Sequence, residues 1–585
     1  MTKPIELNDD ILLNVRKPGR YIGKEHNAIV KQWDDKKIKL CLCYPDTYEI
    51  GMSNLGLKIL YTLVNNREDA LCERCFTPWP DMEDVMLKNE IPLFSLENRM
   101  PLGLFDIIGF SLQHELTYTN ILNMLHLSGI PLESKDRPDR KYPLIIAGGS
   151  SAFNPEPLAD FIDMFIIGDG EEALSDILET LKKSGADRDK VSLLREMSRI
   201  EGVYAPSLYD VSYPDHKLSP RYEGIPKEIK KRSVKELDKK YFPVKPIVPY
   251  ISTVHDRITL EIMRGCPNKC RFCQAANIYN PLRIRKPDEV IGLAEETYRN
   301  TGFDEMSLVS LSSSNYPHIE KLFKGLIDTF APLGVSISLP SLRIEEKLAK
   351  LPLLVGAVKK SGFTFAPEVG TEKMLKVINK NIKHQELFDG LKQAYKSGWR
   401  RVKLYFMIGL PLEEESDLGA IIDLADRAAT LRKDFFRHPA DVVVSVSSFI
   451  PKPHTPFQWF RMQDAIELKS KQNFLISKAS GKKYLKLKFH DAQASILEGV
   501  FSRGDRRMGK VLLKAWQKGA KFDAWSEHFK PALWDEAFLE SGIDKRYYLD
   551  EIDTDSTLGW EHILCGISKE SMLEEYKTVT SRQWQ

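Results

Sequence analysis

The sequence predicts an α/β protein in three parts: a doubly wound N-terminal domain, a partial (β/α)6 barrel and a mainly helical C-terminal domain. Short apolar runs alternate with helical patterns in the first part, and a second alternation follows a stretch rich in charge and proline. The rest of the chain is mainly helical in pattern. At 585 residues the chain is long enough for several domains, each with its own core. We expect boundaries at 1–206, 207–250, 251–462 and 463–585.

Apolar runs rich in β-branched residues predict the strands of the first domain. They are Lys37–Tyr44, Phe105–Leu112, Pro143–Gly149 and Met164–Gly168, and Tyr118–Leu127 between them has the apolar spacing of a helix. This alternation predicts a parallel, doubly wound (Rossmann-like) sheet. Ligands of such sheets bind beyond the carboxyl ends of the strands.

Residues 207–250 combine charged runs with the proline-rich stretch FPVKPIVPY, which predicts a linker. After the linker, residues 251–462 repeat a strand–helix unit, as a parallel barrel does. The predicted strands are Ile258–Met263, Met306–Leu311, Val335–Leu339, Phe363–Pro367, Val402–Gly409 and Val442–Ile450. The active residues of such barrels lie at the carboxyl ends of the strands.

The most specific motif follows the first of these strands. Cys266, Cys270 and Cys273 form a C-x-x-x-C-x-x-C pattern in MRGCPNKCRFCQ. Iron–sulfur clusters are normally held by four cysteines, so three leave one iron of a cubane open to another ligand. Structural zinc requires four closed ligands, and no fourth is obvious, since His255 lies before the strand. The third interpretation is three buried thiols.

Composition sets limits on localisation and partners. Lys plus Arg number 84 and Asp plus Glu 82, so the formal charge of +2 does not indicate a DNA or membrane partner. The N-terminus is acidic where a signal peptide would be basic, and no apolar run reaches the length of a spanning helix. Eight cysteines in so long a chain do not suggest a disulfide framework. We expect a cytoplasmic protein.

The cysteine triad, with Phe272 before its last member, resembles the signature of radical S-adenosylmethionine (SAM) enzymes. The resemblance implies an enzyme with a 4Fe–4S cluster whose open iron binds SAM. In that family one electron cleaves SAM and yields a 5′-deoxyadenosyl radical. The resemblance also implies an electron donor of the flavodoxin or ferredoxin type.

Further contacts to SAM are carried over from this resemblance. It implies that Ser312 and Ser313, after the second barrel strand, lie beside the methionine amine. Glu368 matches a polar position that reaches the ribose or methionine part, and Lys403 would pair with the methionine carboxylate. The segment Phe406–Gly409, with Gly409 at its end, would contact adenine.

The N-terminal domain is similar to the cobalamin-binding domains of some radical SAM enzymes. The turn Asp46–Gly51 is D-x-Y-x-x-G, where those domains have D-x-H-x-x-G. Tyr48 therefore stands where a cobalt-ligating histidine would be, and a phenol is a poor cobalt ligand. The resemblance implies either cobalamin without a lower histidine ligand or a domain that kept only the fold. The whole chain resembles one subfamily with this domain order, whose substrate is not established.

Two other regions leave alternatives open. Four cysteines of the first domain, Cys41, Cys43, Cys72 and Cys75, are expected to be buried thiols rather than a second cluster. The C-terminal part combines basic segments such as KKYLKLKFH with tryptophans. RNA contact is one reading of it, and an ordinary core with a solvated face is the other.

The resemblance thus leaves the substrate unknown, with RNA among the candidates and cobalamin-dependent methylation among the reactions. An electron-transfer or cobalamin-sensing protein is the non-enzymatic alternative. A methylthiotransferase-like RNA- or protein-modifying enzyme is the third, although it normally needs three more cysteines for a second cluster.

Overall fold

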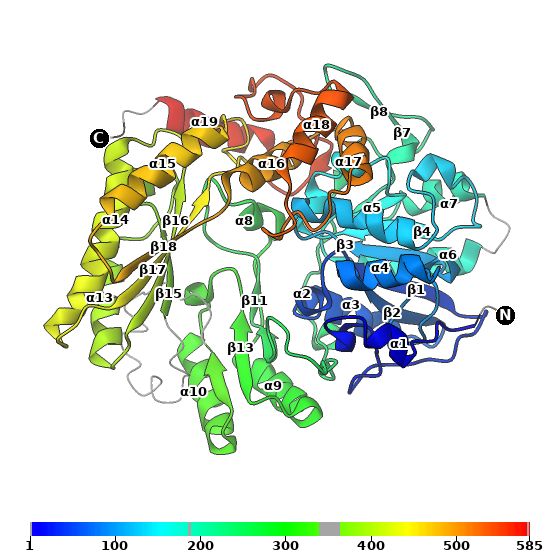
Figure 1. Ribbon diagram of the computed structural model, residues 1–585, viewed down its shortest axis with the longest axis horizontal. Coiled ribbons are helices and arrows are strands. Elements are labelled where there is room, and N and C mark those ends of the chain that lie inside the picture. Colours follow the sequence, from blue (N-terminus) through cyan, green and yellow to red (C-terminus); the bar gives the residue numbers. More distant parts are fainter. Residues whose placement is uncertain (1–2, 185–188, 339–362, 582–583, 585) are drawn as a thin grey trace.

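The computed structural model describes residues 3–184, 189–338, 363–581 and 584. Two α/β units lie side by side, and the C-terminal helices cross above both of them (Figure 1). No helix in the described part of the chain is long and apolar enough to cross a membrane.

The N-terminal unit is built on one sheet with the strand order β2-β1-β3-β4-β5-β6. All neighbours pair in parallel except β5 and β6. The bounds are β1 Ile38–Tyr44, β2 Ala70–Phe76, β3 Ile107–Ser111, β4 Leu144–Gly148, β5 Met164–Ile166 and β6 Val203–Tyr204. The predicted doubly wound sheet is confirmed, and β2 is a strand that the sequence analysis did not predict.

Helices cover both faces of this sheet because their apolar sides face the strands. They are α3 (Leu55–Asn65), α4 (Pro80–Lys88), α5 (Tyr118–Leu127), α6 (Gly170–Ser184) and α7 (Lys190–Met197). Helix α5 has the predicted bounds. The strand ends Gly148 and Ile166 open toward the second unit, which places the ligand edge of the sheet at the junction.

The segment 207–250 joins the units and has local structure. Strands β7 (Tyr209–Val211) and β8 (Leu218–Pro220) form an antiparallel pair. Strand β9 (Ile229–Lys230) pairs in parallel with β19 (Ile563–Leu564) near the C-terminus. This segment is therefore held in place by a strand pair with the region near the C-terminus.

The second unit is a partial barrel in two sheets. One has the order β10-β13-β14 and the other β15-β16-β17-β18, all in parallel. The bounds are β10 Ile258–Glu261, β13 Glu305–Val309, β14 Ser336–Ser338, β15 Phe363–Glu368, β16 Arg401–Ile408, β17 Asp441–Ser448 and β18 Leu485–Phe489. All six predicted barrel strands are present, and β18 continues the sheet beyond residue 462.

The helices of this unit lie on the outside of the two sheets (Figure 1). Helices α9 (Pro287–Thr301) and α10 (Ile319–Phe330) pack on the first sheet. Helices α13 (His384–Lys396), α14 (Glu415–Thr430) and α15 (Ala465–Lys478) cover the second. The inner faces of both sheets are consequently free to line a lumen.

The C-terminal helices α16 (Ala492–Ser502), α17 (Met508–Gln517), α18 (Pro531–Ser541) and α19 (Lys569–Ser581) join the two units. Helix α17 packs on α5 of the first unit. Arg506 reaches back to Glu156, with Nε 3.0 Å from a carboxylate oxygen. Arg503, one of the basic residues of this tail, donates to the backbone carbonyls of Tyr548 and Asp550, so its role here is structural.

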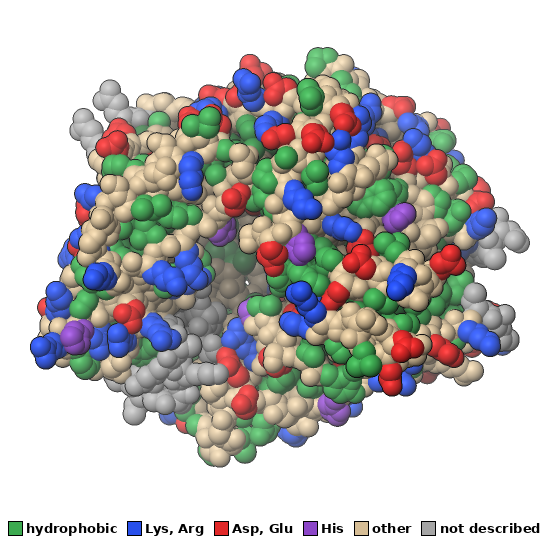
Figure 2. Space-filling model, in the orientation of Figure 1, with side chains coloured by type: hydrophobic (Ala, Val, Ile, Leu, Met, Phe, Trp, Pro, Cys, Tyr) green, Lys and Arg blue, Asp and Glu red, His purple; other side chains and the backbone are tan. Residues whose placement is uncertain are grey.

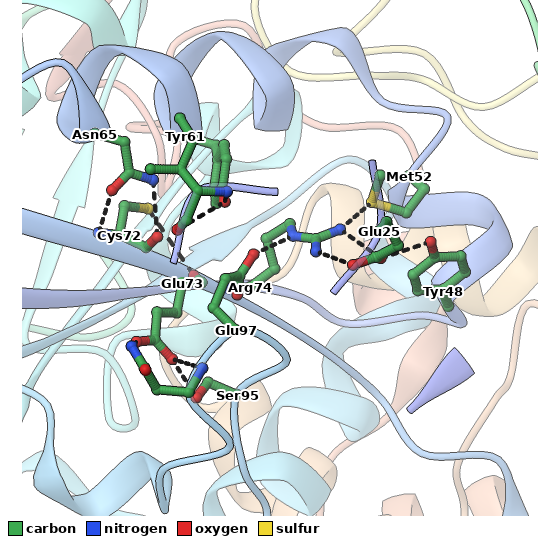
Figure 3. Close-up of polar contacts among 12 residues, drawn as sticks. Glu25, Tyr48, Met52, Tyr61, Asn65, Cys72, Glu73, Arg74, Ser95 and Glu97 are labelled. Atoms are coloured by element: carbon green, nitrogen blue, oxygen red, sulfur yellow. Dashed lines mark hydrogen bonds and ion pairs between the residues drawn. The ribbon is translucent and has the colours of Figure 1, made fainter. Parts of the chain in front are cut away.

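A buried ionic network holds the N-terminal segment to strand β2 (Figure 3). The Arg74 guanidinium lies 2.9 Å from Glu25 and 2.6 Å from Glu97, and all three side chains are fully buried. The Tyr48 hydroxyl donates to Glu25 at 2.8 Å. Burial would raise the pKa of Glu25, but the adjacent guanidinium lowers it, so this carboxylate is charged. One cation thus balances two carboxylates inside the domain.

We expect Arg74→Met to destabilise the N-terminal unit by about 3–5 kcal/mol, because it leaves two buried carboxylates without their cation. Urea unfolding followed by far-UV circular dichroism measures the change. The control is Arg299→Met, since Arg299 is exposed and pairs only with the exposed Glu295, a pair that contributes less than about 1 kcal/mol. Equal stabilities of the two variants would contradict the assigned role of the network.

Candidate functional site

The three cysteines lie on a loop between the short strand β11 (Met263–Arg264) and helix α8 (Gln274–Ile278). Gly265, which begins the loop, has a φ of +87°, and a Cβ there would lie 2.8 Å from the Tyr279 carbonyl oxygen. Only glycine fits this position without strain. The loop therefore turns sharply at the carboxyl end of the first barrel strand, with Cys266 directly after the turn.

The distances between the three sulfur atoms bear on whether they could hold a zinc ion or an iron–sulfur cluster. The three Sγ atoms do not all lie within 4.8 Å of one another, whereas a zinc ion with Zn–S bonds of about 2.3 Å brings sulfurs to about 3.8 Å. In this arrangement the three sulfurs do not form a preformed zinc site. Burial raises the pKa of the Cys273 thiol to about 11, so the positive charge of a metal is needed to hold the thiolate.

Polar side chains fix the loop on both sides. Asn268 donates to the Cys266 sulfur at 3.3 Å and to Ser312 Oγ at 3.2 Å. Arg271 donates to the carbonyls of Lys376 and Val377, and its Nε lies 2.7 Å from Glu575 of the last helix, α19. The loop is thus anchored to the second strand, to the fourth unit of the barrel and to the C-terminus.

A pocket of about 240 Å³ opens at the cysteines. All three cysteines line it, together with Phe272, Ser312, Glu368 and Lys380. The structure therefore brings together residues from the first, second and fourth barrel strands that the sequence placed in one site. Ser313, Lys403 and Gly409 are not among its lining residues. Ser313 is buried one residue further on, and the Lys403 ammonium bonds the Tyr405 hydroxyl at 2.5 Å.

Glu368 is held in an unusual conformation at the end of β15. Its φ is +69°, and the pairing of β15 with β16 is irregular between Phe365 and Glu368. For a residue other than glycine such a backbone costs about 1–3 kcal/mol and is typical of functional sites. The irregularity turns the Glu368 side chain into the pocket.

Lys380 is the functional candidate that the sequence analysis missed. Its Nζ lies 2.8 Å from Glu368 and donates to the Ala366 carbonyl at 2.7 Å, and the residue is 8% exposed. It follows helix α12 (Glu372–Val377) in a loop with no recognisable motif. A buried cation beside a carboxylate can accommodate a zwitterionic ligand, because each group binds the charge opposite to its own.

A second cavity, of about 400 Å³, lies between the two α/β units. The N-terminal sheet contributes its glycine-rich strand ends, among them Gly109, Gly148 and Gly168. The barrel contributes Met263, Tyr279 and Leu311, among others. Leu311 also lines the cysteine pocket, so the two spaces are neighbours.

Charged groups close one side of this interdomain cavity. Arg264 lies 3.0 Å from Asp169, 2.8 Å from Glu171 and 2.8 Å from Glu261. Arg283 makes a further, close contact with Asp169. We call Asp169, Glu171, Glu261, Arg264 and Arg283 the junction cluster. It joins the N-terminal sheet to the cysteine loop.

Tyr48 does not line the interdomain cavity. It lies in the Arg74 network, where burial raises the pKa of its phenol well above the ordinary value (Figure 3). No histidine is among the residues that line the cavity. The side chain at the position of the cobalt-ligating histidine is therefore directed into the Arg74 network.

The remaining cysteines of the first domain are buried thiols. Cys41 and Cys43 lie on β1, with Cys72 and Cys75 on the neighbouring β2. The sulfurs of Cys41 and Cys43 are 3.9 Å apart, and burial raises the pKa of Cys41 to about 12. In the described part of the chain no third cysteine lies close enough to them to form a compact metal site.

A different cluster of potential metal ligands lies beside the N-terminal unit. His114, Glu115 and Glu498 lie close together, but the Lys452 ammonium contacts the two carboxylates at 2.7 and 2.8 Å. The lysine occupies the position that a cation would take. We therefore describe this group as an ion-paired cluster.

Comparisons with known proteins match both units. Residues 56–206 match the family described as radical SAM proteins, N-terminal, and residues 260–425 match the radical SAM superfamily. An uncharacterized protein of Methanocaldococcus jannaschii is 29% identical over 82% of this chain and 91% of its own length. Cytidylyl-2-hydroxyethylphosphonate methyltransferase of Streptomyces wedmorensis is 28% identical over 34% of this chain and 38% of its own.

Among solved structures, the chain is similar to TsrM of Kitasatospora setae, a radical SAM methyltransferase with cobalamin and a [4Fe-4S] cluster bound. The identity is 12%, the TM-score is 0.49, and the match covers 72% of this chain and 77% of that one. The family matches coincide with the two units described above, and the second includes the cysteine loop, Glu368 and Lys380. The chain is thus a radical SAM enzyme that carries the N-terminal domain of that superfamily.

Proposed function

We propose that this enzyme cleaves SAM at a 4Fe–4S cluster in the cysteine pocket and methylates its substrate with the help of cobalamin in the interdomain cavity. The observation that carries the proposal is the adjacency of the two spaces, which share Leu311. A methyl carrier and a SAM-cleaving centre must lie within reach of one substrate, because the reacting groups have to meet.

The residues of the cysteine pocket fit the cluster. Cys266, Cys270 and Cys273 line the pocket and would supply three thiolates, and Asn268 donates a hydrogen bond to one of the sulfurs. Hydrogen bonds to cluster sulfurs tune the reduction potential. When bound, the cluster supplies the electron that cleaves SAM to a 5′-deoxyadenosyl radical.

The pocket also fits the amino-acid part of SAM. The Lys380 ammonium suits the carboxylate, and Glu368 with Ser312 suits the ammonium group. Phe272 offers an apolar surface beside them. Since Lys403 does not line the pocket, we assign the carboxylate contact to Lys380 instead.

The lining of the interdomain cavity suits the flat face of a corrin ring. Its walls come from strand ends with little side-chain bulk, and the deep part is apolar, with Leu42, Ile146 and Leu174. Without a histidine in the lining, cobalt would have no lower imidazole ligand from this cavity. When bound, cobalamin supplies a methyl group to the substrate.

The alternatives have less support. An electron carrier does not need an iron without a protein ligand, nor a strained Glu368 beside that iron. A methylthiotransferase would normally use three further cysteines, whereas the N-terminal cysteines here are buried in β1 and β2. The relatives include a phosphonate methyltransferase and several proteins named methylthiotransferases, so the burial of these cysteines is what favours methylation.

We expect Cys266→Ala, Cys270→Ala and Cys273→Ala each to abolish SAM cleavage by the anaerobically reconstituted protein, because each removes a cluster ligand. The product 5′-deoxyadenosine is measured after reduction, and the EPR spectrum is recorded with and without SAM. Cys565→Ala is the control, since Cys565 is buried far along the chain beside Lys231. SAM cleavage at the unsubstituted rate in a triad variant would refute the site.

We expect Lys380→Met to weaken SAM binding by at least about tenfold, because a charge-assisted contact is lost. Equilibrium dialysis of the cluster-loaded protein measures the affinity. Lys376→Met on the exposed side of α12 is the matched control. Unchanged affinity in Lys380→Met with full iron content would contradict the assigned contact.

We expect Gly109→Leu to prevent cobalamin binding, because its side chain would enter the cavity near Leu42 and Ile146. Cobalamin retained after gel filtration is measured by absorbance. Gly292→Leu is the control, since a Cβ at Gly292 meets open space. If the unsubstituted protein retains no cobalamin, the cofactor assignment fails while SAM cleavage stands.

A further inference from the structure

The inner face of the second barrel sheet is polar and basic. Side chains alternate along a strand, so Val402 and Leu404 of β16 face the helices whereas Lys403 and Tyr405 face the lumen. The same alternation in β18 turns Leu485 toward the helices and Lys486 and Lys488 toward the lumen. Figure 2 shows the molecule hollowed near its centre, with Lys and Arg side chains along the left side of the hollow.

The register places these side chains in two rows across the sheet. Lys403 pairs with Val443 of β17, which pairs with Lys486 of β18. One row further along the strands, Tyr405 pairs with Ser445, which pairs with Lys488. Neighbouring strands are about 4.8 Å apart, so the three ammonium groups can converge on one ligand group.

Asp441 of β17 lies on this face by the same alternation but is paired with Arg400 at 3.0 Å, so among the described residues no carboxylate pairs with the three lysines. Lys403 contacts the Tyr405 hydroxyl, and no ion pair involves Lys486 or Lys488. Carboxylates of the opposite wall are also paired with arginines: Glu261 with Arg264, and Glu305 with Arg257 at 2.9 Å. The described walls of the lumen therefore have an excess of positive charge.

The basic rows lie below the cysteine pocket. Met407 follows Tyr405 on the same side of β16 and packs in one cluster with Phe272 of the cysteine loop. Two residues of a strand span about 7 Å, so the row of Tyr405 is about 7 Å and the row of Lys403 about 13 Å below Met407. A ligand held by the lysines can therefore extend toward the pocket.

We propose that the substrate is a small molecule carrying a phosphate ester or a phosphonate, and that Lys403, Lys486 and Lys488 bind this group in the lumen. The proposal rests on the proposed function, since it places the substrate between the lysines and the cysteine pocket. Three cations match a doubly charged group better than a single carboxylate. The Ser445 hydroxyl, in the row between Tyr405 and Lys488, is a further donor, and the face of the Tyr405 ring that the Lys403 ammonium does not cover is a surface for an attached base.

A nucleic acid is a poorer match for this face. Lys403 lies on the inner face of the sheet and Lys486 and Lys488 are exposed on its edge strand, and the formal charge of the whole chain is only +2. Affinity for a polyanion depends on many phosphate contacts, which three lysines do not supply. Lysines on an edge strand such as β18 also discourage pairing with another chain. If preventing such pairing were the only role of these lysines, replacing them would not change ligand binding.

The test is isothermal titration calorimetry of the cluster-loaded, full-length protein with CMP, AMP and inorganic pyrophosphate. Cytidine, citrate and a twelve-nucleotide RNA serve as comparison ligands. The variants are Lys403→Gln and the pair Lys486→Gln with Lys488→Gln. The matched control is Lys469→Gln on the exposed side of helix α15.

We expect a phosphate-bearing probe to bind, and each lumen variant to weaken it by about tenfold or more, because charged hydrogen bonds are lost. Lys469→Gln should bind as the unsubstituted protein does. Tighter binding of CMP or AMP than of pyrophosphate would assign the attached base to the Tyr405 ring, and equal binding would assign all recognition to the phosphate. Either result supports the proposal.

Three results would overturn it: no binding of any phosphate probe, binding that the lumen variants do not change, or RNA or citrate binding at least as tightly as the phosphate probes. The EPR response to SAM separates this inference from the proposed function. If SAM leaves the EPR spectrum of the unsubstituted protein unchanged, the proposed function fails whatever the calorimetry shows. If the lumen variants keep the EPR response and lose phosphate binding, both stand.

Discussion

The junction cluster is the contact on which the arrangement of the two units depends. Asp169 and Glu171 follow the last parallel strand of the N-terminal sheet, and Arg264 immediately precedes the glycine that turns the cysteine loop. Ion pairs this deeply buried are costly to break, since removing one partner leaves an uncompensated charge worth about 3–5 kcal/mol. The cluster therefore keeps the ligand edge of one sheet facing the first strand of the other. These ion pairs fix the separation between the edge of the N-terminal sheet and the first barrel strand, and the interdomain cavity lies in that space.

The rest of the molecule supports this junction from outside. The segment after the first unit pairs through β9 with β19, and helix α17 packs on α5. Arg506 and Glu156 tie the C-terminal helices to the N-terminal unit. Both units thus contact the tail, which limits their relative movement without contributing to either cavity described above. Arg503 stabilises the tail itself, because it donates to the backbone carbonyls of Tyr548 and Asp550.

The sequence predicted the elements whose pattern is local. The cysteine spacing, the apolar strands and the helix Tyr118–Leu127 each have a period or motif that physical rules recognise. Strand β2 was not predicted, because its sequence ALCERCF contains charged residues although the strand is buried. Arg74 and Glu73 are accommodated there by contacts with Glu97 and Ser95. Strand β18 was not predicted, because lysines at every second position of LKLKF also fit a solvated basic surface. Lys380 could not be found, since its role arises from a fold that brings it beside Glu368.

The anchor between Arg271 and Glu575 has a consequence for how the enzyme is made. The cysteine loop is encoded in the middle of the chain, but one of its supports is a carboxylate on the last helix. During synthesis Glu575 emerges 304 residues after Arg271. Until then Arg271 keeps its contacts to the Lys376 and Val377 carbonyls, but its buried guanidinium has no carboxylate beside it. The fully anchored form of the cysteine loop is therefore available only once helix α19 has folded back onto it, and a chain cut between the two residues would lose this support.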